Sequence, residues 1–379
     1  MNLICLLRAE NASLVDALCE RGHWLYMQRD QAVLFRDLLR RPIQPFDLDG
    51  TNAELPAIFA YGQNLPGVVD AVNKVNDEAA LDGLVTWTDA PGPHRAAVLA
   101  AKHLGIPTFE VTHGALNSYR QGHFECDSYV DYILAPGQEE ADFRAFYGSK
   151  AKVIVTGKPS FDWIANLDKY AIKRAVRDAF HVPEKRPVIV YGMTWRHKFS
   201  TWERDDLALS ERTVLEAHMN LQPLCAPFLI IKQHYANGTK REAMRIRDVC
   251  AGMNIVEYAV TNSDPRIILP AADLVVSHKS SLLVEAVLLD IPCIGFDFRE
   301  RNDFRFYPNL GIEWVERPED LMPAMARCLL DASTKHRLTG ERETARHYFN
   351  GPDDGHAAYR CAETVESICE GREPEVVCA

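Results

Sequence analysis

Short apolar runs alternate with longer amphipathic stretches along most of the chain. The runs have the length of buried strands, and the stretches between them have the periodicity of helices. The clearest unit consists of an apolar run at 81–88, an amphipathic stretch at 93–105 and a second apolar run at 107–114. A strand–helix–strand unit of this kind predicts parallel strands with helices packed on the faces of the sheet.

The same alternation recurs on both sides of a charged helical stretch at 166–180. Further strands are predicted in the first half at 2–8, 23–27, 129–137 and 151–157, and in the second half at 186–195, 227–235, 253–260, 272–278 and 291–298. The sequence therefore predicts an α/β protein with two doubly wound parallel sheets, which are joined near residue 170.

Composition and charge narrow the function classes. The chain has 379 residues, a net charge of −11, and ten cysteines without a CxxC pair or metal-ligand spacing. An acidic chain argues against non-specific coating of nucleic acid, and scattered cysteines are typical of reduced thiols in a cytoplasm. The sequence has no apolar segment long enough to span a bilayer. We therefore expect a cytoplasmic protein whose only membrane contact is peripheral.

Polar residues gather directly after the predicted strands. In open parallel sheets, ligands bind beyond the carboxyl ends of the strands, so these residues are the candidates for chemistry. They are Thr88, Asp89 and the segments 112–123, 193–198, 232–238 and 277–281. We expect the carboxyl edges of the two sheets to line a ligand cleft between the domains.

The segment 277–281, "SHKSS", joins a predicted strand to a predicted helix. Ser280 or Ser281 can cap this helix through its hydroxyl, and the N-terminus of a helix suits a phosphate. Glu285 follows about one turn later on the face of Ser281, where its carboxylate can accept both hydroxyls of a ribose. The residues alone are equally compatible with a capped core helix that carries one solvated glutamate.

Several short motifs occur in a fixed order along the chain. They are "THG" after a first-half strand, "VTGKPSFD" before the charged helix, "VIVYGMTWR", "LIIKQH", "SHKSSLLVEAVLLDIPCI" and "YFNGPDDGHAAYR". In this order the chain resembles the GT-B superfamily, and more narrowly the CDP-glycerol glycerophosphotransferases and related capsule-polysaccharide transferases. The resemblance covers roughly residues 80–365.

The resemblance implies two Rossmann-like domains and transfer of a group from a nucleotide-activated donor to a hydroxyl. The acceptor is then a glycan, a lipid-linked molecule or another hydroxyl compound. The domains expected are an acceptor domain at 1–165, a connector at 166–183, a nucleotide-donor domain at 184–350, and a C-terminal helix and tail at 351–379 that packs back toward the first domain.

Two positions depart from the family pattern. His234 is followed by Tyr235 where the family has a proline, and Glu285 stands where we associate an aspartate with glycerophosphotransferases. Glutamate is the more common residue in sugar-nucleotide enzymes of this fold. The departure favours a sugar over glycerol as the transferred group.

The acceptor side is predicted from residues after two first-half strands. His113 is the candidate general base, because a neutral imidazole can take the proton of an acceptor hydroxyl. Gly114 lets a ligand approach the backbone, and Asn117 is assigned to the acceptor site. Asp89 is a second candidate base, although it also suits a turn before a helix.

The donor side is predicted from the second half. Arginine and histidine can stabilise the departing phosphate, and the resemblance places an aromatic residue beside the nucleobase. The donor-binding residues proposed are Thr194, Arg196, Lys232, His234, Tyr258, His278, Ser280, Ser281 and Glu285, and His234 is also a catalytic candidate. Lys232 and His278 are also compatible with a solvated strand end and an exposed loop.

No Asp-x-Asp motif follows a predicted strand, since "DLD" at 47–49 lies in an irregular region. We therefore predict a metal-independent transferase without a cofactor.

Three other interpretations remain open. A UDP-sugar 2-epimerase of the same architecture would need a valine and a glutamate where this chain has Gly114 and Ala115. A nucleotide-sugar-binding protein without turnover would share the donor site. A transferase acting on a modified DNA base would need a local basic patch, such as 299–309.

Overall fold

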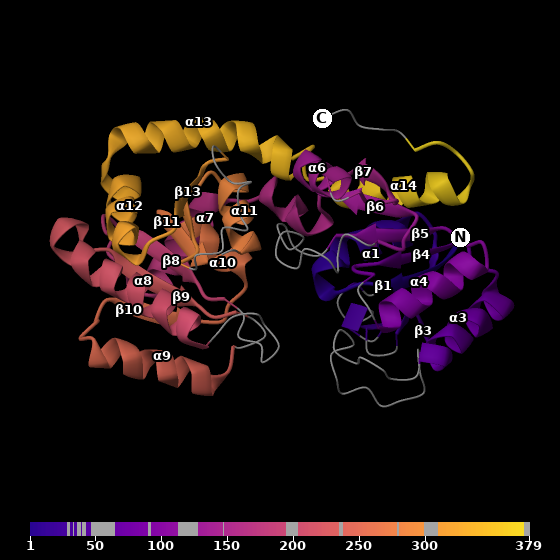
Figure 1. Ribbon diagram of the computed structural model, residues 1–379, viewed down its shortest axis with the longest axis horizontal. Coiled ribbons are helices and arrows are strands. Elements are labelled where there is room, and N and C mark those ends of the chain that lie inside the picture. The colour runs from indigo at the N-terminus through magenta and orange to yellow at the C-terminus, as the bar shows by residue number, and fades with distance from the viewer. Residues whose placement is uncertain are drawn as a thin grey trace. The chain divides into compact units, whose positions relative to one another are not determined.

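The computed structural model describes residues 1–28, 31–32, 34–35, 39, 43–46, 65–89, 92–112, 128–146, 148–194, 204–234, 238–278, 280–298 and 310–374. The chain forms two compact units (Figure 1). Unit 1 contains residues 1–166 and 347–379, and unit 2 contains residues 167–346.

Unit 1 is built on a sheet of seven parallel strands in the order β3-β2-β1-β4-β5-β6-β7. The strands are β1 (Asn2–Leu6), β2 (Trp24–Gln28), β3 (Gln44–Phe46), β4 (Gly83–Thr86), β5 (Thr108–Val111), β6 (Tyr132–Ala135) and β7 (Lys152–Val155). The helical elements are η1 (Ala9–Asn11), α1 (Ala12–Glu20), α3 (Leu65–Ala79), α4 (Pro93–His103), α6 (Gln138–Phe146), η3 (Pro159–Ile164) and α14 (Ala357–Cys369).

The helices of unit 1 cover both faces of its sheet. Residues alternate between the faces along each strand, so Leu3 and Cys5 of β1 join a core with α1 and α14. Ile4 and Leu6 join a second core with α3 and α4. Burial on both faces explains why these strands read as continuous apolar runs.

Unit 2 is built on a sheet of six parallel strands in the order β10-β9-β8-β11-β12-β13. The strands are β8 (Val188–Gly192), β9 (Phe228–Lys232), β10 (Tyr258–Thr261), β11 (Leu274–His278), β12 (Cys293–Phe296) and β13 (Ile312–Val315). The helical elements are α7 (Lys169–Ala179), α8 (Arg204–Cys225), α9 (Lys240–Gly252), α10 (Pro265–Ile268), η5 (Leu269–Ala271), α11 (Ser281–Leu288), α12 (Pro318–Leu330) and α13 (Ala332–Phe349), whose last residues belong to unit 1. The expectation of two doubly wound parallel sheets is confirmed.

The faces of the second sheet are covered by different helices. Helices α8, α9 and α12 pack on one face through a core that includes Ile189, Leu229 and Val276. Helix α11 packs closely on the other face. A Cβ atom on Gly192 would clash with the Cδ2 atom of Leu282 in α11, so a larger residue at the end of β8 would require the Leu282 side chain to move.

The charged helix α7 is attached to unit 2. Lys169 donates to the carbonyl oxygen of Leu289 at 2.6 Å. Lys173 and Arg177 both form ion pairs with Asp273, at 2.7 and 3.1 Å. These contacts hold the segment that precedes β8 against the start of β11.

Two motifs of the sequence form one joint within unit 1. The carboxylate of Asp162 in "GKPSFD" accepts hydrogen bonds from the backbone N–H groups of Ala357 and Ala358 at 2.9 and 2.8 Å. It thereby caps the start of α14, and burial raises the pKa of this carboxyl group. The backbone N–H of Lys158 donates to Asn350 at 2.8 Å. These motif residues therefore attach the C-terminal helix to the first sheet.

In the part of the chain that the structure describes, no helix is long and apolar enough to cross a membrane.

Candidate functional site

The sheet of unit 2 reverses its winding direction between β8 and β11. In doubly wound sheets, ligands bind beyond the carboxyl ends of the strands at this point. The two strand ends are linked by polar side chains, because Ser277 donates to the carbonyl oxygen of Gly192 at 2.8 Å. Thr194 also donates to the carbonyl oxygen of His278, at 3.4 Å. Predicted donor residue Thr194 therefore lies at the switch point.

Helix α11 begins directly after this point. Ser280 is its N-cap and accepts a hydrogen bond from the backbone N–H of Leu282 at 3.3 Å. Ser281 is the first helical residue, and Glu285 follows one turn later on the same face. All three predicted residues are partly exposed. The helix N-terminus, a serine hydroxyl and a carboxylate are thus available together at the edge of the sheet.

Lys232 ends β9 and is only 7% exposed. Its ammonium donates to the carbonyl oxygen of Gln233 at 2.6 Å. Burial lowers the pKa of Lys232, whereas the negative charges of Asp264 and Glu285 act to raise it. The structure therefore shows a desolvated cation near Glu285, and the interpretation of Lys232 as a solvated strand end is wrong.

His234 follows one residue after Gln233 and is partly exposed. The backbone N–H of Gln233 donates to the carbonyl oxygen of Thr261 at 2.8 Å, which ties the end of β9 to the end of β10. His234 therefore lies at the same carboxyl edge as Lys232, and its contact with a donor stays a prediction.

Two predicted donor residues have different surroundings. His278 is buried, with its ring against Phe296 and its Nε2 3.4 Å from Asp297, so it does not lie in an exposed loop. Tyr258 begins β10 and is paired with Leu229. It lies at the amino end of its strand, and the structure does not bring it to the edge that holds Thr194 and Ser280. The residues that lie at this edge are those at and after the carboxyl end of β10, which is Thr261.

Those later residues include a charged pair that sequence reasoning missed. Asp264 caps the short helix α10, and its carboxylate accepts three hydrogen bonds from the side chain of Arg266, at 2.6–3.0 Å. These bonds raise the pKa of Arg266, and the charge of Glu285 contributes in the same direction. The Asp-Pro-Arg sequence was a usable signal, because aspartate before proline is a common helix start.

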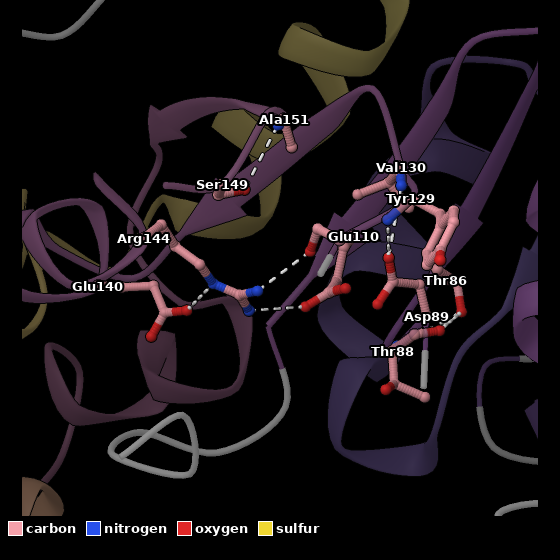
Figure 2. A network of polar contacts seen from close by, with 11 residues as sticks. Thr86, Thr88, Asp89, Glu110, Tyr129, Val130, Glu140, Arg144, Ser149 and Ala151 are labelled. Atoms are coloured by element: carbon pink, nitrogen blue, oxygen red, sulfur yellow. Dashed lines mark hydrogen bonds and ion pairs between the residues drawn. The ribbon is translucent and has the colours of Figure 1, made fainter. Parts of the chain in front are cut away.

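In unit 1, the candidate base Asp89 follows β4 in the sequence and is buried. Its carboxylate accepts hydrogen bonds from the backbone N–H groups of Tyr129 and Val130, which precede β6 (Figure 2). Asp89 therefore has a structural role in joining two segments of the unit. Its role as a base stays a prediction.

Other predicted residues lie outside the described part of the chain. They are His113, Gly114, Asn117 and Arg196. The described chain before them ends at Thr112, which is buried just beyond β5, and at Thr194 beyond β8. Their roles stay predictions.

The first sheet also reverses its winding direction, between β1 and β4. There the guanidinium of Arg8 lies 3.8 Å from the ring centroid of Trp87. His94 of α4 packs edge-on against Trp87, and its Nδ1 lies 2.9 Å from the hydroxyl of Thr86. Burial lowers the pKa of His94 to about 4, so this imidazole is neutral at pH 7. Sequence reasoning did not single out these residues.

A buried ionic network lies next to the end of β5. Arg144 of α6 is 2% exposed, and its guanidinium contacts Glu140 at 2.7 Å and Glu110 of β5 at 3.1 Å (Figure 2). It also donates to the hydroxyl of Ser128 at 3.0 Å. Because Glu110 stands two residues before Thr112, the network holds the strand that leads toward His113.

Among the described residues, no group of three or more histidine, cysteine, aspartate and glutamate side chains has an arrangement that can hold a metal ion. The residues outside the described ranges are not included in this statement, so metal independence stays a prediction.

The fold is shared with solved structures of low sequence identity. A putative UDP-N-acetylglucosamine 2-epimerase from Listeria monocytogenes is 15% identical, with a TM-score of 0.69 over 100% of this chain and 99% of that chain. A glycosyltransferase from Rickettsia africae is 14% identical, with a TM-score of 0.62 over 96% of this chain and 98% of that chain. An Anabaena protein in complex with UDP-glucose is 15% identical, with a TM-score of 0.61 over 97% of this chain and 100% of that chain. These likenesses establish the GT-B fold.

No curated protein matches the chain. A family model does match, over residues 94–367, and its description is CDP-glycerol:poly(glycerophosphate) glycerophosphotransferase. The match contains every motif from "THG" to "YFNGPDDGHAAYR". The chain therefore belongs to the CDP-glycerol:poly(glycerophosphate) glycerophosphotransferase family, a family of transferases, and has the GT-B fold.

Proposed function

We propose that this protein transfers a sugar or a polyol phosphate from a nucleotide-activated donor to an acceptor hydroxyl. Unit 2 binds the nucleotide, and unit 1 supplies the acceptor side. The observation that carries the proposal is the group formed by the N-terminus of α11, Glu285 and the buried Lys232 at the switch point of the second sheet. The family match and the UDP-glucose in the Anabaena protein support the same class of donor.

The groups at the switch point suit the charge that develops during transfer. The acceptor oxygen forms a bond to the transferred group, and the bond from that group to a nucleotide phosphate oxygen breaks. The bonding electron pair stays with this oxygen, and the acceptor proton passes to a base, for which His113 is the candidate. Lys232, the first turn of α11 and the hydroxyl of Ser281 can stabilise the departing phosphate, with Arg196 and His234 as further predicted donors.

A thermal-shift screen tests the donor class. A ligand that binds the native state raises the apparent melting temperature by mass action. The chain should be heated with CDP-glycerol and with CDP-, CMP-, UDP- and GDP-linked sugars. A shift with one of them identifies the donor and decides between a sugar and a polyol phosphate. If none of them shifts the melting temperature and none is turned over, the proposed function is wrong.

We expect Glu285→Ala to weaken binding of the identified nucleotide by about 1–3 kcal/mol, or roughly 5- to 150-fold in Kd. The reason is that the carboxylate would lose its hydrogen bonds to the ribose hydroxyls. Isothermal titration calorimetry measures the change. Glu184→Ala is the matched control, because Glu184 is an exposed glutamate that precedes β8 at the amino edge of the same sheet. Equal affinities of Glu285→Ala and the wild type would show that Glu285 does not contact the donor.

We also expect turnover to survive chelation. If cationic side chains and the helix N-terminus stabilise the leaving phosphate, excess EDTA should leave the rate of nucleotide release unchanged. Turnover that is lost in EDTA and restored by Mg²⁺ or Mn²⁺ would contradict the metal-independent mechanism.

A further inference from the structure

The charged pair after β10 combines a fixed orientation with exposure to solvent. Three hydrogen bonds that the Arg266 guanidinium donates to Asp264 fix its orientation, yet this side chain remains 60% exposed. An arginine that only balanced a surface charge would lose much side-chain entropy for little gain. The pair therefore holds a flat cation in place at the ligand edge of the sheet.

The bonding pattern leaves one part of the guanidinium available. Asp264 accepts from Nε and Nη2, which together form one edge of the plane. The two flat faces of the plane take no part in these bonds. A guanidinium with its edge bound by a carboxylate is suited to stacking on a planar ring.

The neighbours of Arg266 place it beyond the ribose position. Arg266 follows β10, whose last residue Thr261 is paired with Lys232 at the end of β9, and the negative charge of Glu285 acts to raise the pKa values of both Arg266 and Lys232. In a nucleotide the order is phosphate, ribose, base. With phosphate at the start of α11 and ribose at Glu285, the base lies beyond Glu285. Arg266 stands in the helix that follows β10, the edge strand on one side of the sheet, and is therefore a candidate for this position.

We propose that Arg266, oriented by Asp264, stacks on the nucleobase of the donor and contributes to base specificity. This inference rests on the proposed nucleotide-binding function of unit 2. It assigns to Arg266 the contact that the sequence alone led us to place at Tyr258.

The test compares the nucleoside monophosphates CMP, UMP, GMP and AMP with ribose 5-phosphate, which lacks a base. Binding to the wild type and variants is measured by calorimetry or by competition in ligand-observed NMR. We expect Arg266→Ala to weaken the preferred nucleotide by about 5- to 100-fold, the range for losing a stacked base. Ribose 5-phosphate binding should change less than about twofold, because its contacts do not involve Arg266.

Arg266→Lys distinguishes the contribution of the planar guanidinium from that of the positive charge. It should behave like Arg266→Ala, because an ammonium keeps the charge but has no planar face. Asp264→Asn should cause a smaller loss, since the guanidinium remains but is less firmly held.

Arg317→Ala is the matched control. Arg317 is also an exposed arginine bound by an aspartate, Asp320, and it follows β13 at the opposite end of the same sheet. Its replacement should leave every affinity unchanged.

Three results would overturn the inference. If Arg266→Ala binds the nucleotide as tightly as the wild type does, Arg266 does not contact the base. An equal loss for ribose 5-phosphate, or full rescue by Arg266→Lys, would show that Arg266 acts on phosphate as a charge. In these cases the loss caused by Glu285→Ala still supports the donor site, whereas absence of nucleotide binding to the wild type would overturn both proposals.

Discussion

Arg144→Met is expected to lower the free energy of unfolding by about 3–5 kcal/mol, the usual cost of removing one partner from a buried ionic pair. Methionine replaces the apolar stem of the side chain but lacks the guanidinium and its charge. The variant would leave Glu110 and Glu140 buried without the guanidinium that now contacts both. Both carboxylates would then lose the charge that stabilises them, with little water to replace it. Urea unfolding followed by circular dichroism measures the loss.

A second pair in this chain provides the matched control. Arg212 and Glu216 have the same spacing along a helix as Glu140 and Arg144, but Arg212 is 73% exposed. Arg212→Met should leave the urea midpoint nearly unchanged, because water and salt screen exposed pairs. A triple variant that adds Glu110→Gln and Glu140→Gln to Arg144→Met should regain part of the stability. If Arg144→Met unfolds at the wild-type midpoint, the network does not stabilise the unit.

His113→Asn is expected to lower turnover by about 10²- to 10⁴-fold, the usual contribution of a general base. Asparagine retains a hydrogen-bonding edge but cannot accept the acceptor proton. The wild-type rate should also fall as the pH is lowered through about 6.5, the ordinary pKa of an imidazole, because the base must be neutral. Donor affinity should change little, since the phosphate and ribose contacts are assigned to unit 2. Steady-state turnover and calorimetric Kd values are measured on the same preparations.

Asp89→Asn is the comparison for this prediction, and the structure changes what it should do. The Asp89 carboxylate accepts hydrogen bonds from the backbone N–H groups of Tyr129 and Val130. Both bonds go to the same carboxylate oxygen, Oδ2, and a neutral amide oxygen is a weaker acceptor, so Asp89→Asn should lower the melting temperature, whereas His113→Asn should not. If Asp89→Asn abolishes turnover at an unchanged melting temperature while His113→Asn stays active, the aspartate is the base. Normal rates in both variants would place the catalytic centre elsewhere.

The architecture and part of the donor site follow from local sequence patterns. The runs that became β8, β9 and β11 each begin with at least three consecutive apolar residues, because both faces of a parallel strand are buried, and all five positions of each strand are buried in the structure. The serine pair before an apolar helix and the spacing of Ser281 and Glu285 are also local features. For this reason the sequence alone predicted two doubly wound sheets, a cap at Ser280 or Ser281 and a carboxylate one turn later, and the structure assigns the cap to Ser280.

The charged groups that complete the site depend on contacts between distant segments. In the sequence, Lys232 is equally compatible with a donor contact and with a solvated strand end, and only the packing around β9 shows that this residue is buried. Tyr258 was assigned to the nucleobase because the family resemblance places an aromatic residue there, but the apolar run around it shows neither where the strand begins nor which edge its first residue faces.

The contacts that join distant segments of unit 1 could not be predicted from the sequence either. Asp162 caps α14 across 195 residues of sequence, and Arg144 reaches Glu110 across 34. Periodicity reports which face of an element is buried, because that depends on spacing along one segment. Whether a charge is desolvated, paired or presented to a ligand depends on the dielectric and the partners around it. In this protein those partners come from other strands and helices, so only the tertiary structure decides them.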